Sequence, residues 1–230
     1  GNMCSKMNAV AVVSQSCKAM LQEKLSELES KLVCIPNMLD AVAIGQKAGN
    51  SPYTGDMLHI VSVGRLAPEK HFENIIPVAK MLRDMSTDFV WHIVGDGSEQ
   101  ARLESLIVEN DLKDHVILDG SKTNPYPYMK YADLFVHPSY VESQGLTVLE
   151  AMALGVPCVV TKSRGPCEYI EDGVNGLLTE QSPESLAEEV LAILNDKKLY
   201  QHIKENTKCP EQFGPERVIK QIETMIDGEM

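Results

Sequence analysis

The sequence predicts an α/β fold built on a doubly wound parallel sheet, of the Rossmann-like kind. Short apolar runs of strand type alternate with longer helix-like runs from one end of the chain to the other. This alternation predicts parallel strands joined by crossover helices, which cover both faces of the sheet. Ligands of such open sheets bind beyond the carboxyl ends of the strands, so functional residues are sought in the loops that follow strands.

The elements fall into two series. The first has a strand at residues 9–13, an amphipathic helix at 15–30 and a short strand at 31–35. Residues 43–56 are rich in Gly, Asn and Pro and lack apolar periodicity, which predicts a linker. The second series has strands at 58–63, 89–94, 116–118, 134–136, 158–161 and 176–178. Its helices are expected at 72–85, 99–110, 127–131, 146–154, 166–171, 183–194, 198–206 and 215–226.

The bulk composition excludes several function classes. The 230 residues include 21 Lys plus Arg and 33 Asp plus Glu, a formal net charge of −12. Nucleic acids and anionic lipid surfaces attract clustered positive charge, so neither is an expected partner. The apolar runs are shorter than the roughly 18–20 residues that span a bilayer, and no span is expected. The six cysteines lack Cys-x-x-Cys spacing, which favours buried thiols in a reducing cytosol over a metal site or disulfides.

Two glutamates with seven residues between them, Glu142 and Glu150, form the most informative pattern. An apolar strand-like run precedes the pair, and a helix-like run begins after Gly145. The backbone N–H groups of Leu146 and Thr147 should open that helix unpaired, and such a helix N-terminus binds phosphate. A carboxylate thus lies on each side of an anion site. This layout suits a nucleotide sugar, which has phosphates in the middle and hydroxyls at both ends.

A second candidate loop carries two cations. Gly64 and Arg65 follow a predicted strand, and Lys70 lies five residues after Arg65. Two cations in one loop of an acidic chain would neutralise a diphosphate by charge-assisted hydrogen bonds. The alternative is a surface pair bonded to Glu69 or Glu73, which the spacing alone favours.

The paired glutamates resemble the Glu-x7-Glu motif of retaining glycosyltransferases with the GT-B architecture, specifically family 4 (group 1). Other segments match that family in kind and order along nearly the whole chain. They are Ile35-Pro-Asn-Met-Leu-Asp40, which corresponds to the domain hinge of the family, Val63-Gly-Arg-Leu66 with Lys70, Val94-Gly-Asp-Gly97, Pro138-Ser139 and Glu171-Asp-Gly-Val-Asn-Gly-Leu177. Each match is a weak signal by itself, whereas six in register are a strong one.

The resemblance implies the C-terminal half of a GT-B enzyme. Residues 57–230 would be the nucleotide-sugar donor-binding domain and residues 43–56 the linker. Residues 1–42 would be the last strand, helix and strand of the N-terminal acceptor domain. The chain would then be part of a longer protein, inactive alone, with Gly1 a candidate cloning remnant. Its exposed hinge strands are expected to pair truncated chains into a homodimer.

The resemblance also implies roles for the charged candidates. Arg65 and Lys70, together with Gly64, would hold the donor pyrophosphate and stabilise the leaving nucleoside diphosphate. Glu142 would orient the donor sugar and stabilise positive charge on its ring, an electrostatic contribution. Glu150 would bind the ribose hydroxyls through its two acceptor oxygens.

Backbone groups complete the implied site. Gly145, Leu146 and Thr147 would form the phosphate site, and Ser121 and Lys122 would meet the edge of the base. One position departs from the family, because many members have Gly-Phe after the first glutamate where this chain has Ser143-Gln144. A polar side chain there would alter contact with the sugar.

The resemblance therefore implies transfer of a hexosyl group from a nucleoside-diphosphate sugar, UDP favoured, to a glycan or lipid-linked acceptor with retention of configuration. Synthesis of a polysaccharide is the expected setting. The chain contains no Asp-x-Asp pair, so transfer without a metal or other cofactor is expected. The expected location is cytoplasmic, with the full-length protein peripheral at the membrane.

Other functions stay open. One is a non-catalytic nucleotide-sugar-binding module, and another is a GT-B-like epimerase or phosphorylase. A third is a dinucleotide-dependent oxidoreductase, although the Gly95-Asp-Gly97 turn lacks the third glycine of that fingerprint. The hinge segment opposes the first alternative, and Gly-Leu-Thr between the paired glutamates favours a transferase over the second.

Four further residues receive a mainly structural interpretation. His137 ends a strand and is expected to be half-buried and hydrogen-bonded rather than a catalytic base. Asp119 and Asp133 sit at strand edges, where carboxylates bond the backbone or cap helices. Arg164 faces the same side of the sheet as the candidate site and is either a donor or acceptor contact or a surface arginine.

Overall fold

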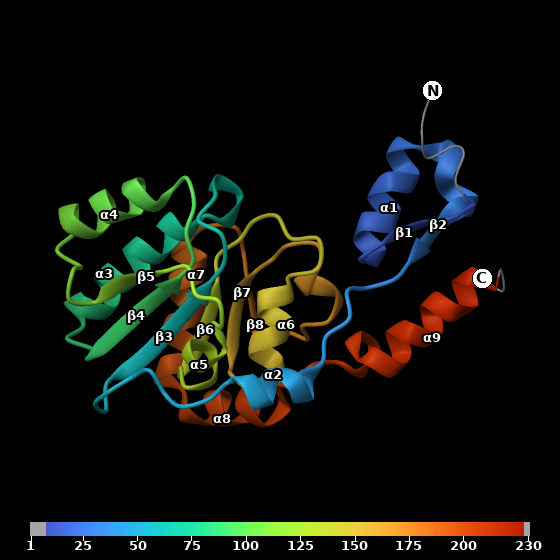
Figure 1. The fold of residues 1–230 in the computed structure, drawn as a ribbon. Helices are drawn as coiled ribbons and strands as arrows, with labels where there is room; N and C mark the ends of the chain where they lie inside the picture. Colours follow the sequence, from blue (N-terminus) through green and yellow to red (C-terminus); the bar gives the residue numbers. More distant parts are fainter. Residues whose placement is uncertain (1–7, 228–230) are drawn as a thin grey trace.

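The computed structural model describes residues 8–227. Its centre is a six-stranded parallel sheet in the order β5–β4–β3–β6–β7–β8 (Figure 1). The strands are β3 (Leu58–Val63), β4 (Phe89–Val94), β5 (Val116–Gly120), β6 (Leu134–His137), β7 (Cys158–Thr161) and β8 (Leu177–Thr179). These bounds agree closely with the predicted strands, and the doubly wound α/β fold is confirmed.

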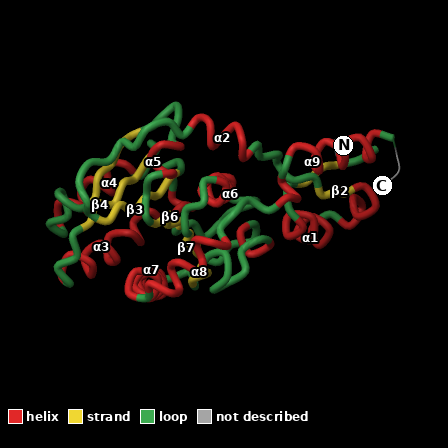
Figure 2. The backbone as a smooth tube through the Cα atoms, turned by 90° about the horizontal axis from the view of Figure 1, so that it is seen from below, coloured by secondary structure: helices red, strands yellow, loops and turns green. Residues whose placement is uncertain are grey.

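Helices cover both faces of the sheet (Figure 2). One face packs against α3 (Ile75–Asp84), α4 (Gln100–Glu109), α7 (Pro183–Asn195) and α8 (Lys197–Asn206). The other face packs against α2 (Ala41–Lys47), α5 (Tyr126–Lys130) and α6 (Leu146–Ala153). Ile60 of β3 joins the first core, while Val61 and Val63 join the second, because side chains alternate across a strand. Burial on both sides explains why the strands read as continuous apolar runs.

The first series forms a separate small unit. Strands β1 (Val10–Val12) and β2 (Leu32–Cys34) pair in parallel, and α1 (Gln15–Lys24) connects them. Val12, Leu28 and Leu32 form its core. The last helix, α9 (Pro215–Ile226), lies next to this unit in both Figure 1 and Figure 2.

The predicted linker is wrong in part, because α2 begins just before it and covers residues 43–47. The Asp40 side chain accepts a hydrogen bond from the Ala43 N–H at 2.9 Å and caps the helix. Ile44 is buried in the core that α6 shares. Only one residue of α2 is buried over its two turns, so its sequence shows little apolar periodicity and does not predict a helix.

Two predicted helices are shorter than expected. The helix expected at 15–30 ends at Lys24, and a 3₁₀ turn, Ser26–Lys31, follows. The helix expected at 166–171 is only a 3₁₀ turn, Pro166–Glu168. There the Asn175 side chain donates to the Tyr169 carbonyl and accepts from the Glu171 N–H, so these backbone groups bond a side chain instead of a helix.

The expectation of buried cysteines holds for Cys158 but not for the others described. Cys17, Cys34 and Cys209 are half-buried, and Cys167 on the Pro166–Glu168 turn is exposed. All of these are free thiols; Cys4 lies outside the described residues, as does the chain start with Gly1. Within residues 8–227, no helix is both long and apolar enough to cross a membrane.

The strand order sets the place of the site. Strand β3 pairs with β4 on one side and with β6 on the other, so successive connections wind in opposite directions from it. The loops that leave the carboxyl ends of β3 and β6 therefore diverge and open a crevice between them. Gly64 and Arg65 follow β3, and Glu142 lies in the loop after β6.

Candidate functional site

A cleft of about 550 Å³ lies between the loops after β3 and β6. Most of the predicted site residues line it, namely Gly64, Arg65, Lys70, Glu142, Gly145, Leu146 and Thr147. Val13 and Asn37 of the N-terminal segment also line it. The tertiary structure thus brings together two loops that are more than seventy residues apart in the sequence.

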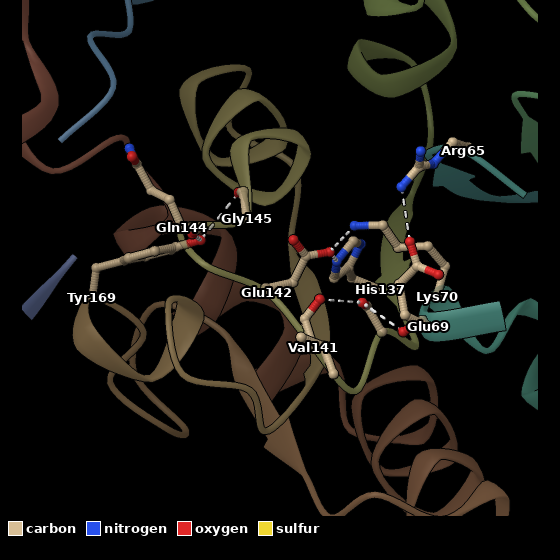
Figure 3. A network of polar contacts seen from close by, with 10 residues as sticks. Arg65, Glu69, Lys70, His137, Val141, Glu142, Gln144, Gly145 and Tyr169 are labelled. Atoms are coloured by element: carbon tan, nitrogen blue, oxygen red, sulfur yellow. Dashed lines mark hydrogen bonds and ion pairs between the residues drawn. The ribbon is translucent and has the colours of Figure 1, made fainter. Parts of the chain in front are cut away.

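Glu142 is the centre of a polar network in this cleft (Figure 3). Its Oε1 accepts a hydrogen bond from the Lys70 ammonium and lies 2.7 Å from the His137 Nε2. The three side chains are largely buried, with His137 only 3% exposed. Burial by itself raises the pKa of Glu142, but the hydrogen bonds and charges of His137 and Lys70 outweigh it and lower this pKa to about 2. Glu142 is therefore an anion throughout the physiological pH range.

Hydrogen bonds to the Glu69 carbonyl hold the two loops together beside this network. The Ser139 hydroxyl donates to the Glu69 and Val141 carbonyls at 3.2 Å, and the Tyr140 N–H donates to the Glu69 carbonyl at 3.3 Å. These bonds fix Lys70, the residue after Glu69, opposite the loop that carries Glu142.

In this structure Arg65 forms a surface ion pair, the alternative to diphosphate binding. Its guanidinium bonds the Glu69 carboxylate at 2.8 Å, as the spacing alone favoured. The Arg65 side chain is 70% exposed, so its pair with Glu69 is a weak surface contact. An anion that binds the guanidinium more strongly can take the place of the Glu69 carboxylate. Lys70 differs, because it pairs with Glu142 rather than with Glu69 or Glu73.

The N-terminus of α6 opens into the same cleft. Gly145 precedes the helix with φ 78°, in the left-handed region, and no side chain of residues 8–227 caps α6. The first N–H groups, those of Leu146 and Thr147, precede the reach of the helical hydrogen bonds and are available to an anion. The Tyr169 hydroxyl donates to the Gln144 and Gly145 carbonyls at 2.9 and 3.2 Å and fixes the turn from behind.

Gln144 points away from Glu142 (Figure 3) and binds the hinge. Its Oε1 accepts from the Asn37 backbone N–H at 2.8 Å and from the Asn37 side chain at 2.9 Å. Its Nε2 donates to the Asn37 carbonyl at 3.1 Å. The polar residue where the family often has Phe thus ties the site loop to the hinge.

Ser121 and Lys122 line a neighbouring cleft of about 300 Å³ with Gly64, Arg65 and Gly95. The two clefts share Gly64 and Arg65, so one elongated ligand can occupy both. The loops of Gly64 and Gly95 are in direct contact, since a Cβ on Gly95 would lie 1.8 Å from the Gly64 carbonyl oxygen. Only glycine permits this approach.

Glu150 lies one turn into α6 and lines neither cleft. Its Oε1 accepts a hydrogen bond from the Tyr126 hydroxyl at 3.1 Å. Burial raises its pKa, and the Tyr126 hydrogen bond offsets part of this effect. Glu150 is half-buried, and the expected partner is a tyrosine of α5.

His137 lies closer to the candidate site than expected from the sequence. It is fully buried rather than half-buried, and it contacts the carboxylate of the first paired glutamate. Its position at the carboxyl end of a strand was the available signal. Asp133 does bond the backbone, through the His59 N–H at 2.8 Å, whereas Asp119 lies 2.9 Å from the His92 ring nitrogen. Within residues 8–227, no group of three His, Cys, Asp or Glu side chains is arranged to hold a metal ion.

Comparison with known proteins decides the family. Residues 50–209, most of the chain, match the family described as "Glycosyl transferases group 1". The chain belongs to this family. The matched residues include both paired glutamates and both cations of the cleft, so the resemblance to group 1 glycosyltransferases is confirmed.

Curated group 1 relatives are longer than this chain. An uncharacterized glycosyltransferase of Methanocaldococcus jannaschii is 32% identical over 157 residues, which are 67% of this chain and 43% of that protein. N-acetyl-alpha-D-glucosaminyl L-malate synthase of Bacillus anthracis is 28% identical over 190 residues, 81% of this chain and 49% of that protein. The chain thus spans less than half of the length of these relatives.

Solved structures of group 1 type share the fold. The S. aureus TarM mutant, crystallised with fondaparinux, alpha-GlcNAc-glycerol and UDP, matches with a TM-score of 0.84 at 23% identity, over 97% of this chain and 45% of TarM. Anabaena HepE, in complex with UDP and glucose, matches with a TM-score of 0.82 at 22% identity, over 96% of this chain and 63% of HepE. These matches agree with the predicted Rossmann-like α/β fold of GT-B glycosyltransferases.

Proposed function

We propose that this chain is the donor-binding part of a retaining hexosyltransferase that uses a UDP-sugar. The observation that supports this function is the single cleft in which the Lys70–Glu142 pair faces the uncapped N-terminus of α6. A diphosphate in that cleft would meet an ammonium group, helix N–H groups and the exposed guanidinium of Arg65. UDP is favoured as the nucleotide because the TarM and HepE structures with this fold hold UDP.

The proposed chemistry uses charges that are already in place. Lys70 and Arg65 would neutralise the leaving diphosphate, which makes a metal ion unnecessary for that step. Glu142 would orient the sugar and stabilise positive charge that develops on its ring, since its low pKa keeps it ionised. Retention of configuration is part of this proposal, as is the role of Glu150 toward the ribose.

The division of the chain is also part of the proposal. Residues 57–230 would form the donor domain, and residues 1–42 would belong to the acceptor domain of a longer cytoplasmic protein. The acceptor, a glycan or a lipid-linked molecule, would contact mainly that domain. We expect the 230-residue chain to transfer no sugar alone, and measured transfer from a radiolabelled UDP-sugar to a sugar acceptor would contradict this division.

Titration calorimetry with UDP, GDP, ADP and NAD, each with and without EDTA, tests the donor site. We expect UDP to bind equally well with EDTA, and Lys70→Ala to weaken it by roughly tenfold or more, because a charge-assisted hydrogen bond is lost. Lys80→Ala is the matched control, since Lys80 is an exposed lysine on α3 outside the cleft. Binding of NAD alone, or an equal effect of both substitutions, would overturn the proposal.

A further inference from the structure

A second cleft, of about 660 Å³, meets the first at Glu142. The two clefts share Val141, Glu142 and Ser143. The second is lined in addition by Cys17, Met20, Tyr140, Lys162, Ser163, Arg164, Cys167 and Gln181. A molecule in the second cleft would therefore reach the carboxylate of Glu142 without entering the diphosphate site.

The walls of this second cleft come from both units of the chain. Cys17 and Met20 belong to α1, and the others belong to the loops after β6, β7 and β8. The Glu168 carboxylate accepts hydrogen bonds from the backbone N–H groups of Gln15 and Ser16 at 3.0 and 2.7 Å. These bonds hold the start of α1 against the donor domain. Hydrogen bonds therefore join the two units on either side of the second cleft.

Three polar side chains that line the second cleft, those of Ser143, Ser163 and Arg164, have no hydrogen-bond or ion-pair partner within residues 8–227. Within residues 8–227, Arg164 has no ion-pair partner and is exposed. The Ser163 side chain is buried, at 6% exposure, and its hydroxyl has no hydrogen-bond partner among the described residues. A buried hydroxyl without a partner is costly, and a bound water or ligand would satisfy it.

The neighbouring polar groups are already engaged. The Lys162 ammonium pairs with Glu180, and Gln181 donates to the Tyr140 and Lys162 carbonyls at 3.0 and 2.8 Å. The available donors include a guanidinium and a hydroxyl at the adjacent positions 164 and 163, in a chain of net charge −12. Both are suited to an anion, and a phosphate has enough acceptor oxygens for the two together.

Other lining residues of the second cleft are apolar. Cys17 and Met20 line it, and Val141 is 66% exposed at the junction of the two clefts. An exposed valine between two clefts offers a surface to an uncharged, apolar part of a ligand.

We propose that this second cleft binds the acceptor, and that the acceptor carries a phosphate monoester held by Arg164 and Ser163. The inference rests on the proposed transferase function, and it deepens it by naming the class of acceptor. The phosphate belongs either to a lipid, whose chain would lie along Cys17 and Met20, or to a phosphorylated sugar. An acceptor hydroxyl would then reach Glu142 and the donor sugar from the second cleft.

Calorimetric titration of the 230-residue chain at saturating UDP tests the proposal, because UDP then occupies the first cleft. The probes are octyl phosphate below its micelle concentration, glucose 1-phosphate, and octyl glucoside as an uncharged control. We expect one of the phosphates, and not octyl glucoside, to bind. Tighter binding of octyl phosphate identifies a lipid phosphate, and tighter binding of glucose 1-phosphate identifies a phosphorylated sugar.

Three variants separate recognition from general charge attraction. Arg164→Gln should weaken the bound phosphate roughly tenfold, and Ser163→Ala should weaken it less, because a hydrogen bond to a charged donor is the stronger one. Arg217→Gln, which changes an exposed arginine of α9, should leave binding unchanged. Equal effects of Arg164→Gln and Arg217→Gln, or no phosphate binding while UDP is bound, would overturn the inference.

The same titrations keep the two proposals apart. UDP affinity is measured first for each variant, and we expect Arg164→Gln and Ser163→Ala to leave it unchanged. If the chain binds UDP but neither phosphate, the acceptor inference alone fails. If UDP itself does not bind, the donor proposal fails.

Discussion

One carboxylate oxygen of Glu142 receives both Lys70 and the His137 ring, and these contacts decide its protonation. Burial opposes ionisation of this glutamate, yet its pKa falls to about 2 because its partners favour the charged form. The position of a carboxylate on the sequence does not fix this outcome. It depends on a lysine from the segment after β3 and on a histidine at the end of β6.

The low pKa of Glu142 predicts a pH dependence of stability. Its folded-state pKa lies below the ordinary value of 4.5, so its stabilising contribution is present above pH 4.5 and is lost as pH falls toward 2. Glu142→Gln should reduce the free energy of unfolding by about 2–3 kcal/mol at pH 7 and by much less near pH 2.5. Urea unfolding at several pH values measures this, with Glu104→Gln, an exposed glutamate of α4, as control. A deficit that is independent of pH would contradict the prediction.

The raised pKa of Glu150 predicts a pH dependence of stability with the opposite sign to that of Glu142. Burial raises the folded-state pKa of Glu150 above the ordinary value of 4.5, so its ionisation costs stability. This cost develops as pH rises from 4.5 to the raised pKa, and it is complete above that pKa. Glu150→Gln should therefore raise the melting temperature by about 2 °C at pH 7, while Tyr126 can still donate to the amide oxygen. The same variant should weaken UDP binding if the carboxylate binds ribose. A lower melting temperature at pH 7 would refute the prediction of a strained carboxylate.

At the scale of elements, two glycines flank α6 with similar left-handed backbones, but only one of them is crowded by neighbouring side chains. Gly145 has φ 78°, and a Cβ there would lie 3.0 Å from both the Pro166 side chain and the Tyr169 hydroxyl. Gly155, just after α6, has a similar φ of 71°, but a Cβ there would have no neighbour within 4 Å among the described residues. The two positions share the backbone strain and differ in crowding.

Substitution of both glycines by alanine separates these effects. Gly155→Ala should cost about 1 kcal/mol of unfolding free energy, the strain of a left-handed non-glycine residue. Gly145→Ala should cost more and should also weaken UDP binding, because Pro166 and Tyr169 must move and the N-terminus of α6 moves with them. Chemical unfolding and calorimetry measure the two quantities. Equal costs would show that crowding at Gly145 is relieved without consequence.

At the scale of the whole molecule, the small N-terminal unit and the large sheet meet through few polar contacts. Gln144 bonds Asn37 at the hinge, and Glu168 bonds the start of α1. Each of β1 and β2 has one paired strand in the described structure, so each has a free edge. Free edges of short sheets promote pairing between chains.

We predict that the 230-residue chain dimerises through this small sheet. Sedimentation equilibrium should show a dimer that Ala11→Lys, an exposed position on β1, converts to a monomer. A lysine at a strand edge opposes pairing because the charge would have to be buried. Ala101→Lys, an exposed position on α4, is the matched control. A chain that is monomeric at all concentrations would contradict the prediction.

Much of the fold could be predicted from local patterns. The strands β3, β4 and β7 begin and end where their apolar runs do, since strands buried on both faces contrast sharply with polar loops. Helix α2 could not be predicted, because its burial depends on Ile44 meeting a core that only the folded chain supplies. The bend after Tyr169 likewise depends on the side chain of Asn175, six residues away.

The sequence by itself determined the parallel doubly wound fold, the family resemblance and the two loops that carry Arg65, Lys70 and Glu142. Apolar periodicity and turn residues are local properties, so they can be recognised from the sequence alone. Only the tertiary structure decided that Lys70 bonds Glu142, that His137 completes the network, and that Gln144 bonds Asn37. Those choices depend on which loops become neighbours when β3 pairs with β6, and pairing between distant strands leaves no local trace in the sequence.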